Sequence, residues 1–146
     1  MEEDKTFLNL RPVLVKLDCL KEHEDCDPNY LEELLGKIIK DGELKRPIIV
    51  DSRTMVILDG HHRYICIKKL GKRYIPAYLI DYSIPEIEVY SWNNNEVVTK
   101  EKVIEAGLSG RKMPPKSTRH MVRIGNELHH ITYIEKEHPY PLSSIP

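Results

Sequence analysis

The stretch Asp59-Gly60-His61-His62-Arg63 decides the fold, because it lies where a β-strand should pass into an α-helix. Residues 55–58 before it are apolar and β-forming, and residues 64–70 after it have the spacing of an amphipathic helix that stops at Gly71. Gly60 permits a tight turn and a close approach of a ligand to the backbone. The first turn of the helix then offers N–H groups without partners and the positive end of the helix dipole. The stretch therefore predicts an anion pocket, and nucleotide phosphates are the anion that we expect.

The side chains of this turn strengthen that prediction. Arg63 carries a planar cation with five N–H donors, and His61 and His62 are two further possible donors. Asp59 has two interpretations, a cap for the following helix or a ligand for Mg²⁺ beside phosphate. The simpler alternative is a capped helix with solvated basic residues. Four polar side chains between an apolar strand and an apolar helix favour the pocket over that alternative.

Composition and charge describe an ordinary globular protein. The chain has 146 residues, of which 40% are hydrophobic and 31% charged, and we expect a single domain over residues 1–146. A net charge of −1 gives no general attraction to nucleic acid or to anionic membranes. The charged amino terminus and the lack of a long apolar run predict a cytoplasmic protein without a membrane partner. The three cysteines form no Cys-x-x-Cys pair, which argues against a disulfide framework or a zinc site, and Cys66 is expected to be a small buried residue.

Hydrophobic periodicity and turn signals predict a compact mixed α/β domain. The expected strands cover residues 13–17, 47–50, 55–58, 74–80, 87–92, 121–124 and 129–134. The expected helices run from Pro28, capped by Asp27, to Asp41-Gly42; from the turn at residues 59–63 to Gly71; and from Thr99 to near Gly107. Pro76 should push its strand toward a sheet edge or place it at the strand start, and the tail from His138 should be irregular. His129 and His130 are expected on the surface of a hairpin around Gly125-Asn126.

Residues 57–64, followed by Lys68-Lys69-Leu70-Gly71, resemble the core motif of the ParB/sulfiredoxin-like superfamily. Within it, the chain is most similar to the archaeal free L-serine kinases, long described as ParB-like proteins. The similarity extends to residues 20–25, 46–51 and 114–120, and so spans about residues 10 to 125. It implies a compact mixed-sheet fold of the α/β (α+β) class. It also implies ATP or ADP and Mg²⁺ as cofactors, and L-serine as the second substrate.

The resemblance further implies roles for individual side chains. The serine kinases carry their catalytic carboxylate in the acidic run that residues 22–27 match, so the general base is Glu24 or Asp25, and the longer reach of Glu24 favours it. Taken alone, this run would be a solvated loop with a helix cap. The residues expected to bind the nucleotide and its phosphates are Asp59, Gly60, His61, His62, Arg63 and Lys116, with Asp59 as the metal ligand.

A second set of residues is expected to bind the amino acid. Trp92 follows the turn at Asp59 at the same distance as a tryptophan that lines the amino-acid pocket of the kinases, although it can also be an aromatic plug at the sheet rim. The hydroxyls and the imidazole within residues 117–120 can bind the carboxylate and amine of a small zwitterion. The expected set is Leu31, Trp92, Ser117, Thr118 and His120.

The sequence therefore predicts a small-molecule kinase that transfers a phosphoryl group from ATP or ADP to the hydroxyl of free L-serine, giving O-phospho-L-serine. The donor stays open between ATP and ADP. A monomer or small homo-oligomer is expected. The chain is shorter than these kinases usually are, and residues 93–113 look trimmed.

The alternative is a ParB-like nucleotide-binding or NTPase module associated with DNA. Its only support is a basic cluster that equally suits a solvated face, and the neutral net charge argues against nucleic acid. Sulfiredoxin chemistry needs a cysteine after the glycine, where this chain has His61. The basic cluster consists of Arg111, Lys112, Lys116, Arg119 and Arg123.

Overall fold

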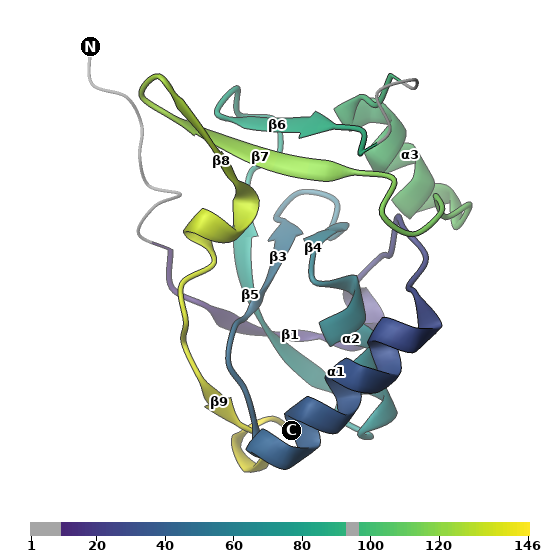
Figure 1. Cartoon of the computed structure of the whole chain (residues 1–146), viewed down its shortest axis with the longest axis vertical. Coiled ribbons are helices and arrows are strands. Elements are labelled where there is room, and N and C mark those ends of the chain that lie inside the picture. The colour runs from purple at the N-terminus through teal and green to yellow at the C-terminus, as the bar shows by residue number, and fades with distance from the viewer. Residues whose placement is uncertain (1–9, 93–96) are drawn as a thin grey trace.

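A four-stranded mixed sheet forms the centre of the computed structural model, which describes residues 10–92 and 97–146 (Figure 1). The strand order is β1-β5-β3-β4; β3 pairs parallel with β5 and antiparallel with β4, and β1 pairs antiparallel with β5. The strands are β1 Val13–Lys16, β3 Ile48–Asp51, β4 Ile57–Asp59 and β5 Tyr74–Ile80. The expected mixed-sheet class is confirmed.

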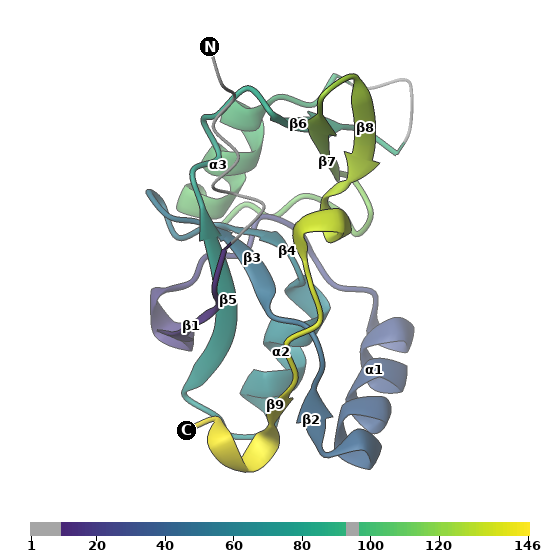
Figure 2. The same cartoon turned by 90° about the vertical axis from the view of Figure 1, so that its left-hand side faces the viewer.

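Two helices pack against each other beside this sheet, α1 Pro28–Asp41 and α2 His61–Lys69 (Figure 2). The Asp27 side chain accepts hydrogen bonds from the first turn of α1, and Gly42, with a φ of 69°, ends the helix as expected. Cys66 of α2 is fully buried, also as expected. The residue before α2 is Gly60, with no side-chain cap, so the interpretation of Asp59 as a helix cap is wrong. Among the described residues, no helix has the length and apolar character needed to cross a bilayer.

A second sheet, β6-β7-β8, lies across one end of the molecule next to α3 (Figure 1). Successive side chains of β3 point to opposite faces of the central sheet and so belong to two apolar clusters. Ile48 and Val50 pack in the cluster that includes α2, whereas Ile49 packs in the cluster that includes this second sheet. The elements here are β6 Ile87–Tyr90, α3 Lys100–Ser109, β7 Arg119–Ile124 and β8 Glu127–His130. Short pieces complete the fold: β2 Glu43–Leu44, β9 Tyr140–Pro141 and 3₁₀ turns at Leu17–Cys19, Ile131–Ile134 and Leu142–Ser144.

Several expected boundaries are wrong for identifiable reasons. Helix α3 runs through Gly107 and ends at Gly110, because Gly107 is a packing residue: a Cβ there would lie 2.7 Å from Val56 Cγ2. The predicted strand 129–134 becomes a 3₁₀ turn after His130, and the tail contributes β9 and the buried Ile145. Strand β5 is central rather than at an edge; it tolerates Pro76 because pairing with β3 begins only at Ala77.

The segment between β1 and α1 pairs with two other parts of the chain, the residues around the start of β4 and the loop between α3 and β7. Lys21 exchanges backbone hydrogen bonds with Met55 and Ile57 at one side. Further along, the Asp25 N–H donates to Met113 O, and the Met113 N–H donates to His23 O, each at 2.8 Å. The acidic run is therefore a strand-like bridge rather than a solvated loop. Of the stretch 93–113 that is expected to be shortened, residues 93–96 lie outside the described residues.

Candidate functional site

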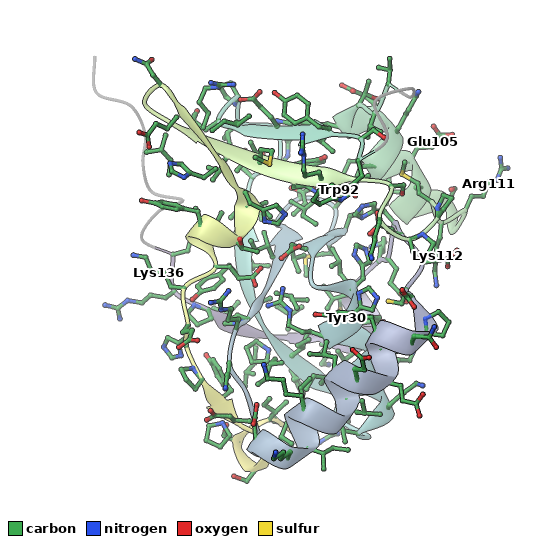
Figure 3. The ribbon with its side chains drawn as sticks, in the orientation of Figure 1. Tyr30, Trp92, Glu105, Arg111, Lys112 and Lys136 are labelled. Atoms are coloured by element: carbon green, nitrogen blue, oxygen red, sulfur yellow. The ribbon has the colours of Figure 1, made fainter. Side chains whose placement is uncertain are left out.

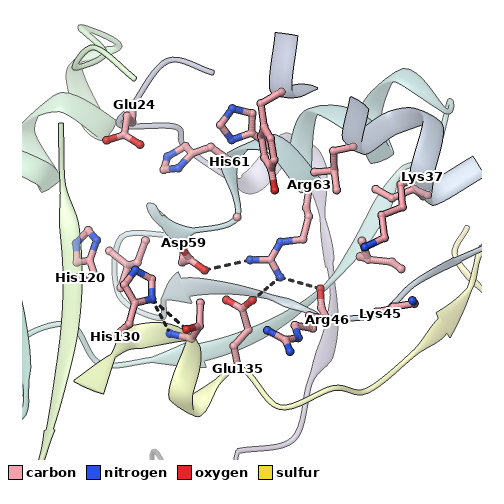
Figure 4. Close-up of a pocket in the computed structure, with 18 of the residues that line it drawn as sticks. Glu24, Lys37, Lys45, Arg46, Asp59, His61, Arg63, His120, His130 and Glu135 are labelled. Atoms are coloured by element: carbon pink, nitrogen blue, oxygen red, sulfur yellow. Dashed lines mark hydrogen bonds and ion pairs between the residues drawn. The ribbon is translucent and has the colours of Figure 1, made fainter. Parts of the chain in front are cut away.

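A cavity of about 570 Å³ opens between α1, the start of α2 and the second sheet (Figure 4). Ten of the thirteen residues predicted for the site line it, and they come from four separate segments of the chain. Asp25, Leu31 and Ser117 do not line it. The ten are Glu24, Asp59, Gly60, His61, His62, Arg63, Trp92, Lys116, Thr118 and His120.

Gly60 fixes the path of the chain into the cavity. Its φ of 105° is one that residues with a side chain rarely adopt. A Cβ on Gly60 would lie 2.4 Å from Ile48 Cγ2 and 2.9 Å from Arg63 Nη2. The turn is thus pressed against β3, and the first residues of α2 form part of the cavity wall. This is the arrangement in which a helix N-terminus meets an anion.

The acidic run places one carboxylate, Glu24, in the cavity wall. Its Oε1 accepts hydrogen bonds from the backbone N–H groups of Ser117 and Thr118 at 2.9 and 3.0 Å, and both hydroxyls lie 3.1 Å away. Among the described residues, Oε2 has no hydrogen-bond partner. Asp25 is exposed and outside the cavity wall. Of the two carboxylates predicted as the base, Glu24 is thus the one that faces the cavity, and Ser117 and Thr118, predicted to bind substrate, contact this carboxylate.

Arg63 lies at the centre of an ion cluster (Figure 4). Its Nη2 is 3.1 Å from Asp59 Oδ2, and its Nη1 is 2.8 Å from Glu135 Oε1. Nη1 also donates to the carbonyl oxygens of Arg46 and Pro47. Only 15% of the Arg63 side chain is exposed. Protein groups thus occupy both terminal nitrogens that we expected to serve phosphate, and Arg63 acts first as an anchor for two carboxylates.

Glu135 is a cavity residue that the sequence did not reveal. It is 4% exposed, and its Oε2 has no partner among the described residues. Burial raises the pKa of Glu135 to about 9, although Arg63 opposes this shift. Burial also acts to raise the pKa of Asp59, but the interaction with Glu135 and the charge of Arg63 hold it below its usual value. Burial thus favours the protonated form of Glu135, whereas the charge of Arg63 favours the ionised form of Asp59.

Both histidines of the turn accept hydrogen bonds through Nε2. The His23 N–H donates to His61 at 3.3 Å, and the Asp27 N–H donates to His62 at 3.0 Å. Burial lowers the pKa of both rings, that of His61 well below its usual value. The rings are thus neutral, and Nδ1 is the nitrogen of each ring that stays available as the possible donor expected from the sequence. Through Nε2, they hold the acidic run against the start of α2.

The remaining predicted residues differ in their surroundings. His120 is buried, its Nε2 is 2.8 Å from the Tyr82 hydroxyl, and burial lowers its pKa to about 3. Trp92, 54% exposed, lies at the cavity on the side of the second sheet (Figure 3). Leu31 packs against the apolar cluster of α1 and α2, so its predicted contact with substrate is not supported by its position. His130 lines the cavity, which corrects its expected place on the hairpin surface.

The cavity is lined by charged side chains of both signs, and its acidic residues are Glu24, Asp41, Glu43, Asp59, Glu135 and Glu137. Four cationic residues besides Arg63 line it: Lys37, Lys45, Arg46 and Lys116. The predicted basic cluster, by contrast, is divided among different partners. Lys112 pairs with Glu22, Arg123 pairs with Glu88, and Arg119 lies over the rings of Tyr90 and Trp92. Arg111 and Lys112 lie at the outer side of the molecule near α3 (Figure 3). Across residues 10–92 and 97–146, no three histidine, cysteine or acidic side chains form a metal-binding group.

The relatives of this chain are serine kinases and ParB-like proteins, although no family model matches it. It is 33% identical over 101 residues to an ATP-dependent L-serine kinase of Staphylothermus marinus, covering 66% of this chain and 40% of the relative. It is 46% identical over 74 residues to a ParB-like protein of Sulfolobus acidocaldarius, covering 51% and 37%. An ADP-dependent L-serine kinase of Thermococcus kodakarensis is 32% identical over 100 residues, covering 62% and 41%. The chain thus spans about two fifths of the length of these relatives.

Solved structures agree on the fold. A conserved hypothetical protein from Pyrococcus furiosus superposes with a TM-score of 0.80 at 16% identity, covering 94% of this chain and 98% of the other. A free serine kinase in complex with AMP superposes with a TM-score of 0.71 at 18% identity, covering 83% and 91%. The expected resemblance to ParB-like proteins and archaeal free serine kinases, and the fold that it implies, are confirmed.

Proposed function

We propose that this chain is a single-domain, nucleotide-dependent kinase that phosphorylates the hydroxyl of free L-serine. The observation that carries the proposal is the position of Glu24, whose carboxylate shares one cavity wall with the N-terminus of α2. A phosphate-binding site and a general base thereby lie in the same cavity, as phosphoryl transfer requires. The serine kinases among its relatives supply the substrate class. A cytoplasmic location and a monomeric or small oligomeric state stay predictions.

The phosphate grip combines backbone and side chains. The first turn of α2 offers N–H groups and its positive dipole end. Lys37 and Lys116 line the same cavity without an ion-pair partner among the described residues, whereas Lys45 and Arg46 are paired with Asp41 and Glu137. Charge-assisted hydrogen bonds from such groups to phosphate are shorter and about twice as strong as neutral ones. We assign the donor nucleotide, ATP or ADP, to this part of the cavity.

The same wall fits Mg²⁺ beside the phosphates. The Asp59 carboxylate is a hard oxygen donor at the cavity, and the buried, unpartnered Oε2 of Glu135 becomes a second one when Glu135 gives up its proton. Mg²⁺ is commonly bound by one or two carboxylates together with phosphate oxygens, so Asp59, with Glu135, would hold it. When bound, the metal neutralises charge that develops on the transferred phosphoryl group.

We assign to Glu24 the role of the general base that accepts the proton of the serine hydroxyl. The serine hydroxyl approaches Oε2, its O–H bond breaks, and the proton passes to the carboxylate. The serine oxygen forms a bond to the terminal phosphorus of the nucleotide. The bond from that phosphorus to the bridging oxygen breaks, and its electron pair leaves with ADP, or with AMP if ADP is the donor. The N–H groups of Ser117 and Thr118 keep the carboxylate oriented throughout.

The ParB-like relative supports the alternative, a nucleotide-binding module associated with DNA. The two functions differ in the acceptor. A kinase needs a small zwitterion beside the terminal phosphate, and we assign its binding to Trp92 and His120, which line the cavity. A DNA-associated module predicts no response to serine, and duplex binding that weakens steeply with salt.

The deciding experiment incubates the purified protein with serine, Mg²⁺ and either ATP or ADP, and measures phosphoserine by mass spectrometry. Glu24→Gln should lower kcat by about 10²–10⁴-fold, because it removes the base, while the affinity for nucleotide stays within about twofold. Asp25→Asn is the matched control, since Asp25 is exposed and outside the cavity wall. Equal loss in both variants, or phosphoserine formation undiminished in Glu24→Gln, would remove the base from this position. No phosphoserine with either donor, together with salt-sensitive DNA binding, would support the alternative.

A further inference from the structure

A fully buried histidine, His23, lies beside the proposed base without contacting it directly. Its Nδ1 is 2.7 Å from the carbonyl oxygen of Ile57. Because a carbonyl oxygen only accepts hydrogen bonds, Nδ1 must carry a hydrogen. Burial lowers the pKa of His23 to about 4, so the ring holds only this one hydrogen at neutral pH. Nε2 is therefore a bare acceptor inside the protein.

The hydroxyl of Thr118 lies between two acceptors. Its Oγ1 is 3.0 Å from His23 Nε2 and 3.1 Å from Glu24 Oε1, and it has one hydrogen to give. Among the described residues, Nε2 has no other hydrogen-bond partner, and a buried acceptor without a donor is costly. Glu24 Oε1 already accepts two backbone N–H groups. The hydrogen of Thr118 therefore points to His23, and the lone pairs of Oγ1 face Glu24.

We propose that His23 is a positioning residue that acts through Thr118 to keep Glu24 a strong enough base for phosphoryl transfer. The proposal rests on the proposed kinase function. By drawing the Thr118 hydrogen away, His23 withholds one donor from the Glu24 carboxylate. The carboxylate is then oriented by two N–H groups but not further stabilised as an anion.

The hydroxyl of Ser117, which lies near the same carboxylate oxygen, is also drawn away by a protein acceptor. Its Oγ is 2.6 Å from the carbonyl oxygen of Pro114, closer than the 3.1 Å to Glu24 Oε1. The hydrogen of Ser117 is thus directed to Pro114. Both neighbouring hydroxyls turn oxygen rather than hydrogen toward Glu24, and in each case a protein acceptor causes this.

Other titratable groups surround the pair, and their charges act on Glu24 alike in the wild type and in a His23 variant. A comparison of the two therefore isolates the effect of His23. The groups that face His23 or Glu24 from the packed elements are Asp59, His61, His62, His120, Cys26 and Lys116.

The first test compares His23→Asn with the wild type. The asparagine amide can still donate to Ile57 O but leaves no acceptor for Thr118, whose hydrogen then turns to Glu24. We expect the acid limb of the kcat–pH profile to move down by about one pH unit, and kcat at pH 7 to fall about three- to tenfold. KM for serine and for nucleotide should stay within about twofold, because neither substrate contacts His23. Tyr82→Phe is the matched control, since it removes a buried hydrogen bond to His120 that does not reach Thr118.

A double-mutant cycle shows whether the effect passes through Thr118. In the Thr118→Val background, His23→Asn should change neither kcat nor the pH profile further, because no hydroxyl remains to be redirected. An equal effect of His23→Asn in both backgrounds would overturn the proposal. An unmoved acid limb in His23→Asn, or a limb that moves equally in Tyr82→Phe, would overturn it as well.

A second measurement needs neither a variant nor activity. Nitrogen-15 NMR of the histidine rings should show His23 neutral, with hydrogen on Nδ1 and none on Nε2, near pH 7. Hydrogen on Nε2 would mean that Thr118 donates to Glu24, and would overturn the proposal even if the protein is a kinase. Absence of phosphoserine would refute the kinase function instead, so the two failures are distinguishable.

Discussion

Replacing Gly60 by alanine is the sharpest test of how the phosphate turn is built. Two separate penalties are expected at this position. The φ of 105° is unfavourable for a residue with a Cβ, which costs about 1–2 kcal/mol. The new Cβ would also lie 2.4 Å from Cγ2 of Ile48, a fully buried residue of β3 that has no room to move. Such overpacking costs typically about 1–3 kcal/mol.

The Gly60→Ala variant should therefore lose about 3 kcal/mol of unfolding free energy, which lowers Tm by roughly 6–12 °C in a protein of this size. Thermal and urea unfolding followed by circular dichroism measure the loss. Gly42→Ala is the matched control, because Gly42 also has a positive φ, 69°, but nothing lies within 4 Å of its Cβ position. It should lose only the conformational part, about 1 kcal/mol. Equal losses in the two variants would show that the turn is not pressed against β3.

Two further predictions concern the ion cluster. Arg63→Leu should lose about 3–5 kcal/mol, because it leaves the Asp59 carboxylate without its cation and the buried Glu135 and two carbonyl oxygens without their donor. Arg63→Lys should recover only part of this, since lysine lacks the fork that reaches four acceptors; full recovery in urea unfolding would contradict the described contacts. For Glu135, the folded pKa of about 9 lies above the ordinary value of 4.5, so the folded state binds an extra proton and stability falls as pH rises between these values. The lowered pKa values of His23 and His120 make stability rise with pH only up to about 6.5. Between about pH 7 and 9, without Mg²⁺, the free energy of unfolding of the wild type should thus fall by up to about 1.4 kcal/mol per pH unit relative to that of Glu135→Gln. If the unfolding free energies of the two proteins change with pH in parallel, Glu135 is not protonated in the folded state.

Capping residues and hydrophobic periodicity predicted the helix ends and the strand–turn–helix unit, because these depend only on neighbouring residues. Asp27-Pro28 and Gly42 mark the ends of α1 because capping needs only neighbouring residues. The strand, turn and helix around Gly60 follow from periodicity in the same way. Gly107 was misjudged because a glycine in a helix can serve packing as well as termination, and its partner, Val56, is 51 positions earlier in the sequence.

Features of the site that depend on distant contacts were not predictable. Nothing in the sequence marks Glu135, since a glutamate after a hairpin is usually solvated and becomes buried here only by meeting Arg63. The acceptor roles of His61 and His62 depend on backbone N–H groups of residues 23 and 27, which only the folded chain brings near. The preference for Glu24 over Asp25 as the proposed base likewise rests on contacts with Ser117 and Thr118, which are distant in the sequence.

The hydrogen bonds that orient Glu24 have a consequence for the order in which the protein matures. They join residues 93 and 94 positions apart, and such distant pairings form late because closing a long loop costs entropy. On the ribosome, Glu24 emerges long before Ser117 and Thr118. A nascent chain can therefore complete the turn at Gly60 while its base is still unoriented. In the proposed kinase, Glu24 would thus be oriented for phosphoryl transfer only after residues 117 and 118, just before β7, have emerged and folded back onto it.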